Sequence, residues 1–218
     1  MKILITALVS VLSLVAFEAS ARNLHLIEQD TASGFAIYRL GAPDPSDMKE
    51  LCALGVSEIM VLSGNADKYE FKNAAACPTL KVIYNHKQNA KKPLTAEFLE
   101  GFDQWIAESQ SLGKKIAFRC SCGCHRTGRL AAYYQMKYQG LTSSQAIAVM
   151  MNLGKWMFIY PGLDNQVRAL EDYIAGEKCG EKKKWCVRLE SNSAGPEVAL
   201  GTTDDNDAEN DGELHDDL

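Results

Sequence analysis

The sequence has 218 residues, of which 46% are hydrophobic and 23% are charged, and these values exclude a disordered chain, a collagen-like chain and a polytopic membrane protein. The formal net charge of -5 is unevenly distributed, because eight Asp and Glu residues and no Lys or Arg lie between residues 204 and 218. The rest of the chain is mildly basic, which suits a small anionic substrate and is too weak a charge to indicate a nucleic-acid partner.

The first 21 residues have the pattern of a signal peptide. Lys2 is followed by an uncharged, largely apolar run at 3–17 and then by small residues at 19–21 that suit cleavage by a signal peptidase. The apolar run is shorter than the ~20 residues that a membrane-spanning helix needs. We therefore predict export to the periplasm or beyond, with no stable membrane insertion after cleavage. The predicted organisation is a signal peptide at 1–21, a single domain at 22–190 and a disordered acidic tail at 191–218.

Strands and helices alternate in the first half of the mature chain. Residues 35–40 have the composition of a strand, and the segment rich in Gly and Pro that follows is typical of a turn. Ser46 is expected to cap a short helix that ends at Gly55. Two further apolar strands are expected at 58–62 and 81–84, each followed by a polar loop.

The second half of the chain is predicted to be mainly helical. Thr95 is expected to cap a helix with an aromatic face, and residues 115–119 form the last predicted strand. Three helices are expected after it, one that ends near Gln139 and two at 143–153 and 164–175. This order predicts an α/β fold with a largely parallel central sheet flanked by helices and a helical C-terminal half. In such sheets, ligands bind beyond the carboxyl ends of the strands.

Seven cysteines are present, and an odd number leaves at least one unpaired in an oxidising compartment. Cys179 and Cys186 are the easiest pair to close a short loop. Cys52 and Cys77 are either buried thiols or disulfide partners. The other three crowd together directly after the last predicted strand, and they are Cys120, Cys122 and Cys124.

The segment from Cys120 to Arg129 connects the last predicted strand to a helix. Its first Cys and first Arg are separated by five residues, enough to curl the backbone into a cradle whose amides face an anion at the positive end of the helix. Gly123 supplies the backbone freedom of a tight cradle, and Arg126 can bind two phosphate oxygens at once. The same amides should lower the pKa of the Cys120 thiol from about 8.5 to between roughly 3.5 and 7.5, which makes it a nucleophile at neutral pH.

Cys-x5-Arg-Thr-Gly between a strand and a helix resembles the signature of the cysteine-dependent phosphatases, the protein tyrosine phosphatase superfamily. Residues 38–43 and 54–62 are similar to the entry segment of its dual-specificity-like bacterial branch, so the resemblance covers residues 35 to 175. It implies a protein tyrosine phosphatase-like fold and hydrolysis of phosphate esters through a phosphocysteine, with no metal or cofactor. The implied catalytic residues are Cys120, Arg126 and Thr127, and the implied phosphate-binding residues are Ser121, Cys122, Gly123, Cys124, His125 and Arg126.

Two positions depart from the pattern of the family. Arg119 stands where the family usually has a His before the nucleophile, and a cation there is still expected to lower the thiol pKa. The general acid of the family is usually an Asp about thirty residues before the Cys, and that stretch of this chain has no carboxylate. Asp67 and His86 are the candidates for the proton donor. Asp103 is a weaker candidate, because it is expected to face solvent on the aromatic helix.

Cations beside the cradle indicate the kind of substrate. His86, Lys87, Lys91 and Lys92 are expected to lie at the strand ends near His125, and several cations around a phosphate site favour a small polyanionic phosphate ester. A lysine-rich loop that is merely solvated is an equal alternative. An exported member of the family with such a rim resembles the phytase-like branch, whose substrates are inositol polyphosphates. The alternative substrate is a phosphorylated protein, as for a tyrosine or dual-specificity phosphatase.

Other interpretations of the cysteine-rich loop stay open. Its three thiols and His125 are residue types that bind Zn or Cu, although structural zinc sites usually contain two separated ligand pairs. A sulfurtransferase also places a Cys in an anion cradle, and a disulfide between Cys120 and Cys122 or Cys124 would act as a redox switch. Without a general acid, the domain could instead bind phosphorylated ligands without cleaving them. Three aromatic residues are expected in the core or in a wall of the pocket, and they are Trp156, Phe158 and Tyr160.

Overall fold

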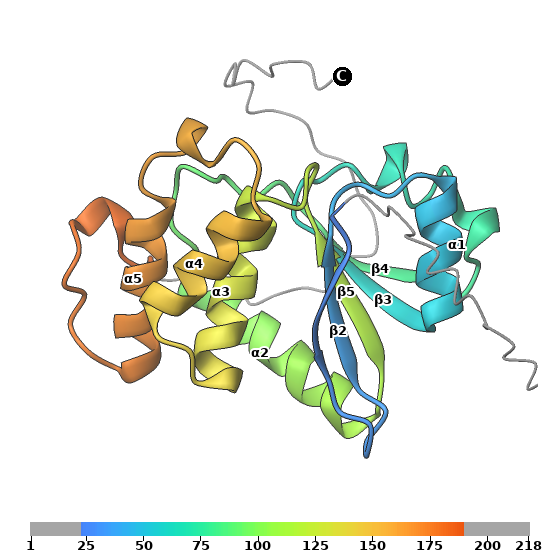
Figure 1. Ribbon diagram of the computed structural model, residues 1–218, viewed down its shortest axis with the longest axis horizontal. Helices are drawn as coiled ribbons and strands as arrows, with labels where there is room; N and C mark the ends of the chain where they lie inside the picture. The colour runs from blue at the N-terminus through green and yellow to red at the C-terminus, as the bar shows by residue number, and fades with distance from the viewer. Residues whose placement is uncertain (1–22, 190–218) are drawn as a thin grey trace, which may run out of the picture.

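The computed structural model describes residues 23–189 and contains a five-stranded sheet with helices on both faces (Figure 1). In spatial order β1-β2-β5-β3-β4, the four strands from β2 to β4 are parallel, and β1 pairs antiparallel with β2. The predicted largely parallel sheet is therefore confirmed. The predicted signal peptide and acidic tail lie outside the described residues. The strands are β1 (His25–Gln29), β2 (Ala36–Leu40), β3 (Val56–Val61), β4 (Lys81–Asn85) and β5 (Lys115–Arg119).

The helix at Pro45–Leu54 covers one face of the sheet, and the α-helices that follow it in the chain lie on the other side (Figure 1). α1 packs on a cluster that includes Leu40, Met48 and Ile59, whereas the larger cluster on the opposite face includes Phe102 and Phe118. None of the helices in the described part of the chain is long and apolar enough to span a membrane. The helices are α1 (Pro45–Leu54), α2 (Ala96–Ser111), α3 (His125–Gln139), α4 (Ser143–Leu153) and α5 (Leu163–Ala175).

The start of α1 differs from the prediction. Asp44 caps this helix, not Ser46, because its carboxylate accepts hydrogen bonds from the backbone amides of Ser46 (2.6 Å) and Asp47 (2.9 Å). The Asp47 carboxylate accepts from the Asp44 amide in return (3.0 Å), which completes a capping box. The end of the helix is as predicted, since Gly55 adopts a left-handed conformation with φ of 79°.

The sequence pattern did not reveal β1. This strand lies at the edge of the sheet, and its residues are only partly buried, so they lack the continuous apolar run of the inner strands. A shift of register between Leu26 and Glu28 also interrupts the alternation of its side chains.

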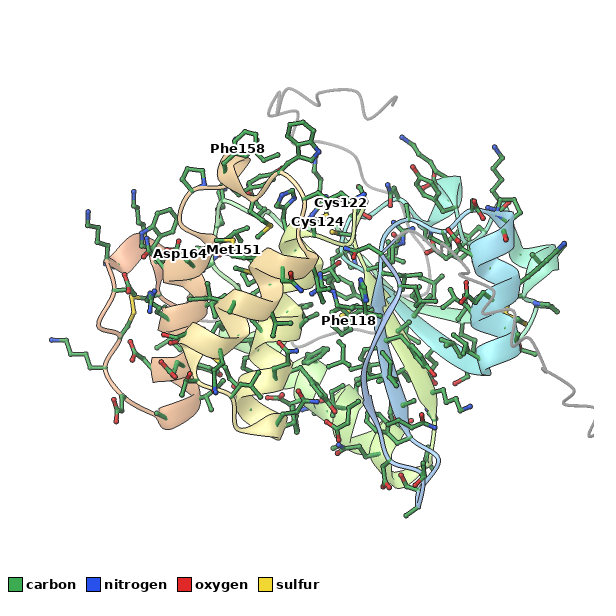
Figure 2. The ribbon with its side chains drawn as sticks, viewed as in Figure 1. Phe118, Cys122, Cys124, Met151, Phe158 and Asp164 are labelled. Carbon is green, nitrogen blue, oxygen red and sulfur yellow. A yellow bond between two sulfur atoms is a disulfide. The ribbon has the colours of Figure 1, made fainter. Side chains whose placement is uncertain are left out.

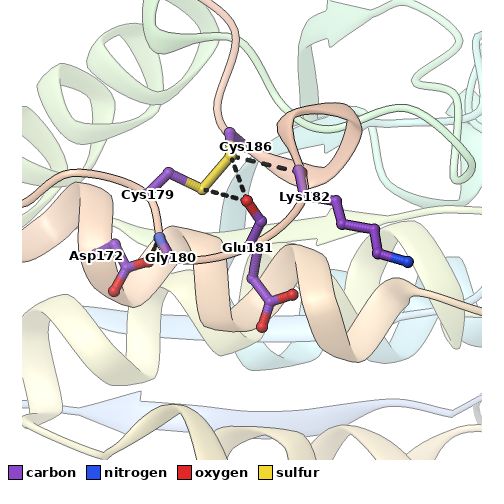
Figure 3. Close-up of a disulfide and its surroundings, with 6 residues drawn as sticks. All are labelled: Asp172, Cys179, Gly180, Glu181, Lys182 and Cys186. Atoms are coloured by element: carbon purple, nitrogen blue, oxygen red, sulfur yellow. Dashed lines mark hydrogen bonds between the residues drawn. A yellow bond between two sulfur atoms is a disulfide. The ribbon is translucent and has the colours of Figure 1, made fainter.

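Two disulfides are present in the described part of the chain. Cys179 and Cys186 close a loop after α5, as predicted, with their Cα atoms 6.0 Å apart (Figure 3). In that loop the Gly180 amide donates a hydrogen bond to Asp172 Oδ2 at 2.7 Å. Cys52 and Cys77 form the second disulfide, with Cα atoms 5.3 Å apart, and it joins α1 to the segment before β4. The thiols of the cysteine-rich loop are free.

Removing the Cys52–Cys77 disulfide should destabilise the fold by about 3 kcal/mol, because the bond closes a ring of 25 residues and restricts the unfolded chain. The double variant Cys52→Ser/Cys77→Ser tests this in urea denaturation under non-reducing conditions. The matched control is Cys179→Ser/Cys186→Ser, whose shorter separation of 7 residues predicts a loss of about 2 kcal/mol. A larger loss in the control than in the first variant would contradict the argument.

Candidate active site

A cavity of about 270 Å³ lies at the carboxyl ends of β3, β4 and β5. This is the edge of the sheet where a parallel fold is expected to bind ligands. The side chains and backbone that line it follow three different strands, and they are Ser63, Gly64, Asn65, Asp67, Lys68, Lys87, Ser121 and Arg126.

The cysteine-rich loop is held tightly against the end of β2. Gly123 has a φ of 70°, and a Cβ atom at this position would lie 2.6 Å from the carbonyl carbon of Leu40. Only glycine fits this close approach without displacing the backbone. The Ala42 amide donates to the Ser121 carbonyl at 2.8 Å and fixes the other side of the loop. The loop is therefore a rigid cradle.

The cradle ends at the N-terminus of α3. The first backbone hydrogen bond of this helix runs from the Gly128 amide to the Cys124 carbonyl at 2.9 Å, so the amides of residues 125–127 have no partner within the helix. These amides and the helix dipole favour an anion at this point. Arg126 extends from the same turn into the cavity wall, where its Nη1 donates to the Leu62 carbonyl at 3.3 Å.

Cys120 directly precedes Ser121, which lines the cavity, and only 1% of Cys120 is exposed. A hydrogen bond with the Cys122 side chain and burial raise the pKa of the Cys120 thiol to about 12, while Arg126 and Thr127 lower it. Thr127 is fully buried, and its hydroxyl has no nitrogen or oxygen partner among the described residues, so its proton is available to the sulfur. The predicted fall in the pKa of Cys120 is wrong for this ligand-free state.

The two other thiols explain why the prediction fails. Cys122 Sγ accepts a hydrogen bond from the Cys124 amide at 3.1 Å, so one of the amides of the cradle is already occupied. A hydrogen bond with the Cys122 side chain, one with the Lys155 backbone and, least strongly, the charge of Arg39 lower the pKa of Cys124 to about 7. Of the three thiols, only Cys124 has a lowered pKa, whereas the pKa values of Cys120 and Cys122 are raised. Figure 2 shows Cys122 and Cys124 together at the end of the sheet, beyond Phe118.

Arg119 does not act on the nucleophile as the sequence suggested. Its guanidinium forms a buried ion pair with both carboxylate oxygens of Glu70 and donates to Ser63 Oγ (2.7 Å) and Asn65 Oδ1 (2.6 Å). Arg126 and Thr127, rather than Arg119, lower the pKa of Cys120. Arg119 thus fixes the loop that follows β3.

The loop after β3 contributes a carboxylate and a cation to the cavity. Asp67 and Lys68 are exposed and line it together with Arg126. Gly64, with a φ of 64°, lets the loop approach Lys87, since a Cβ at this position would lie 2.8 Å from the Lys87 amide nitrogen. Of the two proposed proton donors, the structure brings Asp67 to the cavity and leaves His86 outside its lining, with the imidazole against the Tyr84 ring.

Only one of the three predicted rim lysines lines the cavity. Lys87 does so, whereas Lys91 and Lys92 do not. Two hydrogen bonds hold the loop that carries these lysines against α3 and α5. Arg129 Nη1 donates to the Lys92 carbonyl at 2.6 Å, and Gln166 Nε2 donates to the Ala90 carbonyl at 3.0 Å.

His125 faces the C-terminal helices instead of the cavity. Its Nε2 lies 3.2 Å from the Trp156 carbonyl, and its ring packs on Tyr160 with 4.5 Å between the centroids. Burial lowers the pKa of His125. The expectation for the aromatic residues nearby is wrong for Trp156 and Phe158, which are 66% and 73% exposed.

Asp103 also differs from the prediction. It does not face solvent freely, because its carboxylate accepts hydrogen bonds from the hydroxyls of Tyr133 and Tyr138 (both 2.8 Å) and from Lys137 Nζ (2.6 Å). These contacts tie α2 to α3. They leave Asp103 no part in the cavity.

The thiols of the loop do not form a metal site with their neighbours. Within residues 23–189, no three His, Cys, Asp or Glu side chains are grouped so that they could hold a metal ion.

The chain is similar to solved structures of several phosphatases. TpbA of P. aeruginosa is 20% identical, and the match has a TM-score of 0.52 and covers 72% of this chain and 98% of TpbA. The catalytic core of Siw14, a PP-IP phosphatase of S. cerevisiae, is 19% identical, with a TM-score of 0.53 and coverage of 71% and 88%. All belong to the protein tyrosine phosphatase superfamily. The chain has the protein tyrosine phosphatase fold. No family model matches its sequence.

Sequence analysis missed three residues that shape the site of this protein tyrosine phosphatase fold. Lys68 lines the cavity, and Glu70 pairs with Arg119. Arg39 lies buried behind the cradle and donates to the Gly123 carbonyl. One signal was available for Arg39, because it is the only charged residue of the strand Ala36–Leu40, and a buried charge needs a partner.

Replacing Cys122 by Ala should lower the pKa of Cys120 from about 12 toward its ordinary value, because it removes the hydrogen bond that raises this pKa most. Iodoacetamide reacts with the thiolate, so the labelling rate of Cys120 at about pH 8 should rise in the variant. Site-resolved mass spectrometry across a pH series measures the rate for each cysteine.

Cys124→Ala is the matched control for this experiment. It should remove the labelling step at the pKa of about 7 that belongs to Cys124, and it should leave Cys120 slow at neutral pH. Equal labelling of Cys120 in the parent and in Cys122→Ala would contradict the effect assigned to Cys122.

Proposed function

We propose that the chain is a phosphoric monoester hydrolase that works through a phosphocysteine on Cys120. The observation that carries this proposal is that the buried Cys120 thiol interacts with Arg126, which lines the cavity, and with Thr127 in the first turn of α3. A phosphate group that binds to Arg126 and to the amides of the cradle brings its phosphorus next to this sulfur.

The reaction consists of two displacements at phosphorus. In the first, Cys120 Sγ forms a bond to phosphorus while the bond to the ester oxygen breaks, and Asp67 donates a proton to that oxygen. In the second, the Asp67 carboxylate takes a proton from the water that attacks phosphorus, the S–P bond breaks to return the Cys120 thiolate, and inorganic phosphate is released. Arg126 neutralises the equatorial oxygens in both steps, and the Thr127 hydroxyl stabilises the departing thiolate.

Substrate binding activates the nucleophile. A phosphate group must take the Cys124 amide from Cys122 Sγ, because this amide belongs to the cradle. When Cys122 moves away, Cys120 loses the hydrogen bond that raises its pKa most, while Arg126 and Thr127 still lower it. The thiol is thus kept protonated until an anion occupies the loop.

The substrate that suits the cavity carries more than one phosphate, and we propose an inositol polyphosphate. Lys68 and Lys87 add two positive charges to that of Arg126, against the single carboxylate of Asp67. The likeness to the PP-IP phosphatase Siw14 supports this choice. Phosphotyrosine is the alternative, and the TpbA structure in complex with pTyr favours it. The cation count of the cavity favours the polyphosphate.

We also propose that the chain is exported and acts in the periplasm or beyond. The two disulfides support this, since such bonds form and persist in oxidising compartments. The signal peptide predicted at 1–21 would direct the export.

Cys120→Ser should abolish turnover of both aryl and alkyl phosphates. Asp67→Asn should reduce the kcat for an alkyl phosphate by about 10²- to 10⁴-fold and affect an aryl phosphate far less, because a phenolate leaves without a proton. Steady-state phosphate release from the two kinds of ester measures both effects.

Asp30→Asn is the control for the aspartate. Asp30 is an exposed turn residue whose Oδ1 accepts from the Ala32 amide at 2.9 Å, and Asn keeps that acceptor, so activity should be unchanged. Turnover that persists in Cys120→Ser would overturn the proposed function. An equal loss on both esters in Asp67→Asn would exclude Asp67 as the proton donor.

Lys68→Ala and Lys87→Ala should each raise the KM for inositol hexakisphosphate about fivefold, which corresponds to about 1 kcal/mol for one exposed charge pair. The KM for a phosphotyrosine peptide should change less. Lys91→Ala is the matched control, because Lys91 belongs to the same loop as Lys87 and does not line the cavity. A preference of the parent for the peptide would favour the alternative substrate.

A further inference from the structure

Arg39 is a charged residue in the interior of the fold. It lies in β2, only 1% of its surface is exposed, and β1 and β5 flank its strand. Among residues 23–189 no carboxylate forms an ion pair with it, and its Nε and Nη1 atoms have no hydrogen-bond partner there. A buried charge without a partner is costly, so it calls for an explanation.

Within residues 23–189, the one hydrogen bond that the Arg39 side chain forms leads to the cradle. Its Nη2 donates to the Gly123 carbonyl at 2.5 Å. The same carbonyl accepts from Asn23 Nδ2 at 3.0 Å. Two donors fix the direction of this carbonyl, and the Cys124 amide of the same trans peptide must point the opposite way. Arg39 therefore helps to set the direction in which the loop presents its donors.

The groups that surround the Arg39 guanidinium are mostly uncharged. β1 contributes His25, whose pKa is lowered by burial and by Arg39, so this imidazole is neutral at neutral pH. α3 contributes the backbone of Gly128, where a Cβ atom would lie 3.8 Å from Arg39 Nη2. The groups near Arg39 that can become anions are the three thiols of the loop. Burial lowers the pKa of Arg39, and the interaction with these thiols raises it.

We infer that Arg39 is the buried counter-charge of the cradle, a positioning residue that orients the Gly123 carbonyl and holds an anion in the loop from behind. The anion that this chain itself can supply is the Cys124 thiolate, since Cys124 has the lowest pKa of the three thiols. The part of the inference that concerns phosphate rests on the proposed function, since a bound phosphate would take the place of the thiolate as the partner of Arg39. Arg126 binds the anion from the cavity side, and Arg39 acts on it through the loop.

Two variants separate the charge of Arg39 from its hydrogen bond. Arg39→Gln keeps a donor for the Gly123 carbonyl and removes the charge, whereas Arg39→Lys keeps the charge and loses the planar fork. The test is the pH dependence of iodoacetamide labelling at Cys124, followed by site-resolved mass spectrometry below the melting temperature of each variant. Arg39→Gln should raise the midpoint above the parent value of about 7, and Arg39→Lys should leave it there.

The double variant Glu70→Gln/Arg119→Met is the matched control, because it removes another fully buried guanidinium together with its partner and does not touch the thiols. It should lower the melting temperature and leave the Cys124 midpoint at about 7. If Arg39 has only a structural role, Arg39→Gln should also lower the melting temperature and leave the Cys124 midpoint unchanged. That result would overturn the inference.

Folding and activity give two further readouts. If Arg39→Gln does not fold, the test rests on Arg39→Lys. This variant must fold, and its labelling midpoint at Cys124 must equal that of the parent. A raised midpoint in Arg39→Lys would also overturn the inference. Phosphate release reports separately on the proposed function. An inactive parent with the expected labelling profiles would refute the phosphatase and keep Arg39 as the counter-charge of the loop.

Discussion

Burial of the Cys120 sulfur is the constraint to which the rest of the site responds. At 1% exposure the thiolate loses almost all its hydration, so any charge on it must be stabilised by the protein. Arg126 and Thr127 supply that stabilisation, and Cys122 opposes it in the ligand-free state. The balance between these groups decides when the sulfur becomes a nucleophile. It also explains why the pKa of Cys120 is raised in a loop whose motif is typical of a reactive cysteine.

Three buried arginines organise the three loops around the cavity. Arg119 pairs with Glu70 and fixes the loop after β3, and Arg129 holds the carbonyls of the loop after β4. Arg39 holds the cradle after β5 through the Gly123 carbonyl. Each guanidinium is rigid, permanently charged and able to donate in several directions, which suits the task of fixing irregular backbone inside a protein. The loops are therefore positioned from the interior, while their outer faces are free to bind a substrate.

The sequence was sufficient for the parts of the structure that depend on local pattern. The inner strands, the main helices, the Cys179–Cys186 pair and the cradle follow from apolar periodicity, capping residues and one motif. The partner of Arg119 could not be found in this way, because Glu70 is distant in the sequence and meets it only through the sheet order. The prediction of a low pKa for Cys120 failed for a related reason, since the motif does not tell which way the Cys122 side chain turns.

The Cys52–Cys77 disulfide encloses the whole segment that contains Asp67 and Lys68, so the outer half of the cavity belongs to a covalent ring. The loop beside it contains three free thiols, and the proposed reaction needs that of Cys120 to stay reduced. One chain therefore needs opposite oxidation states a short distance apart. Activity should be confined to a window of ambient reduction potential, because strong reductants would open the ring and strong oxidants would consume the nucleophile.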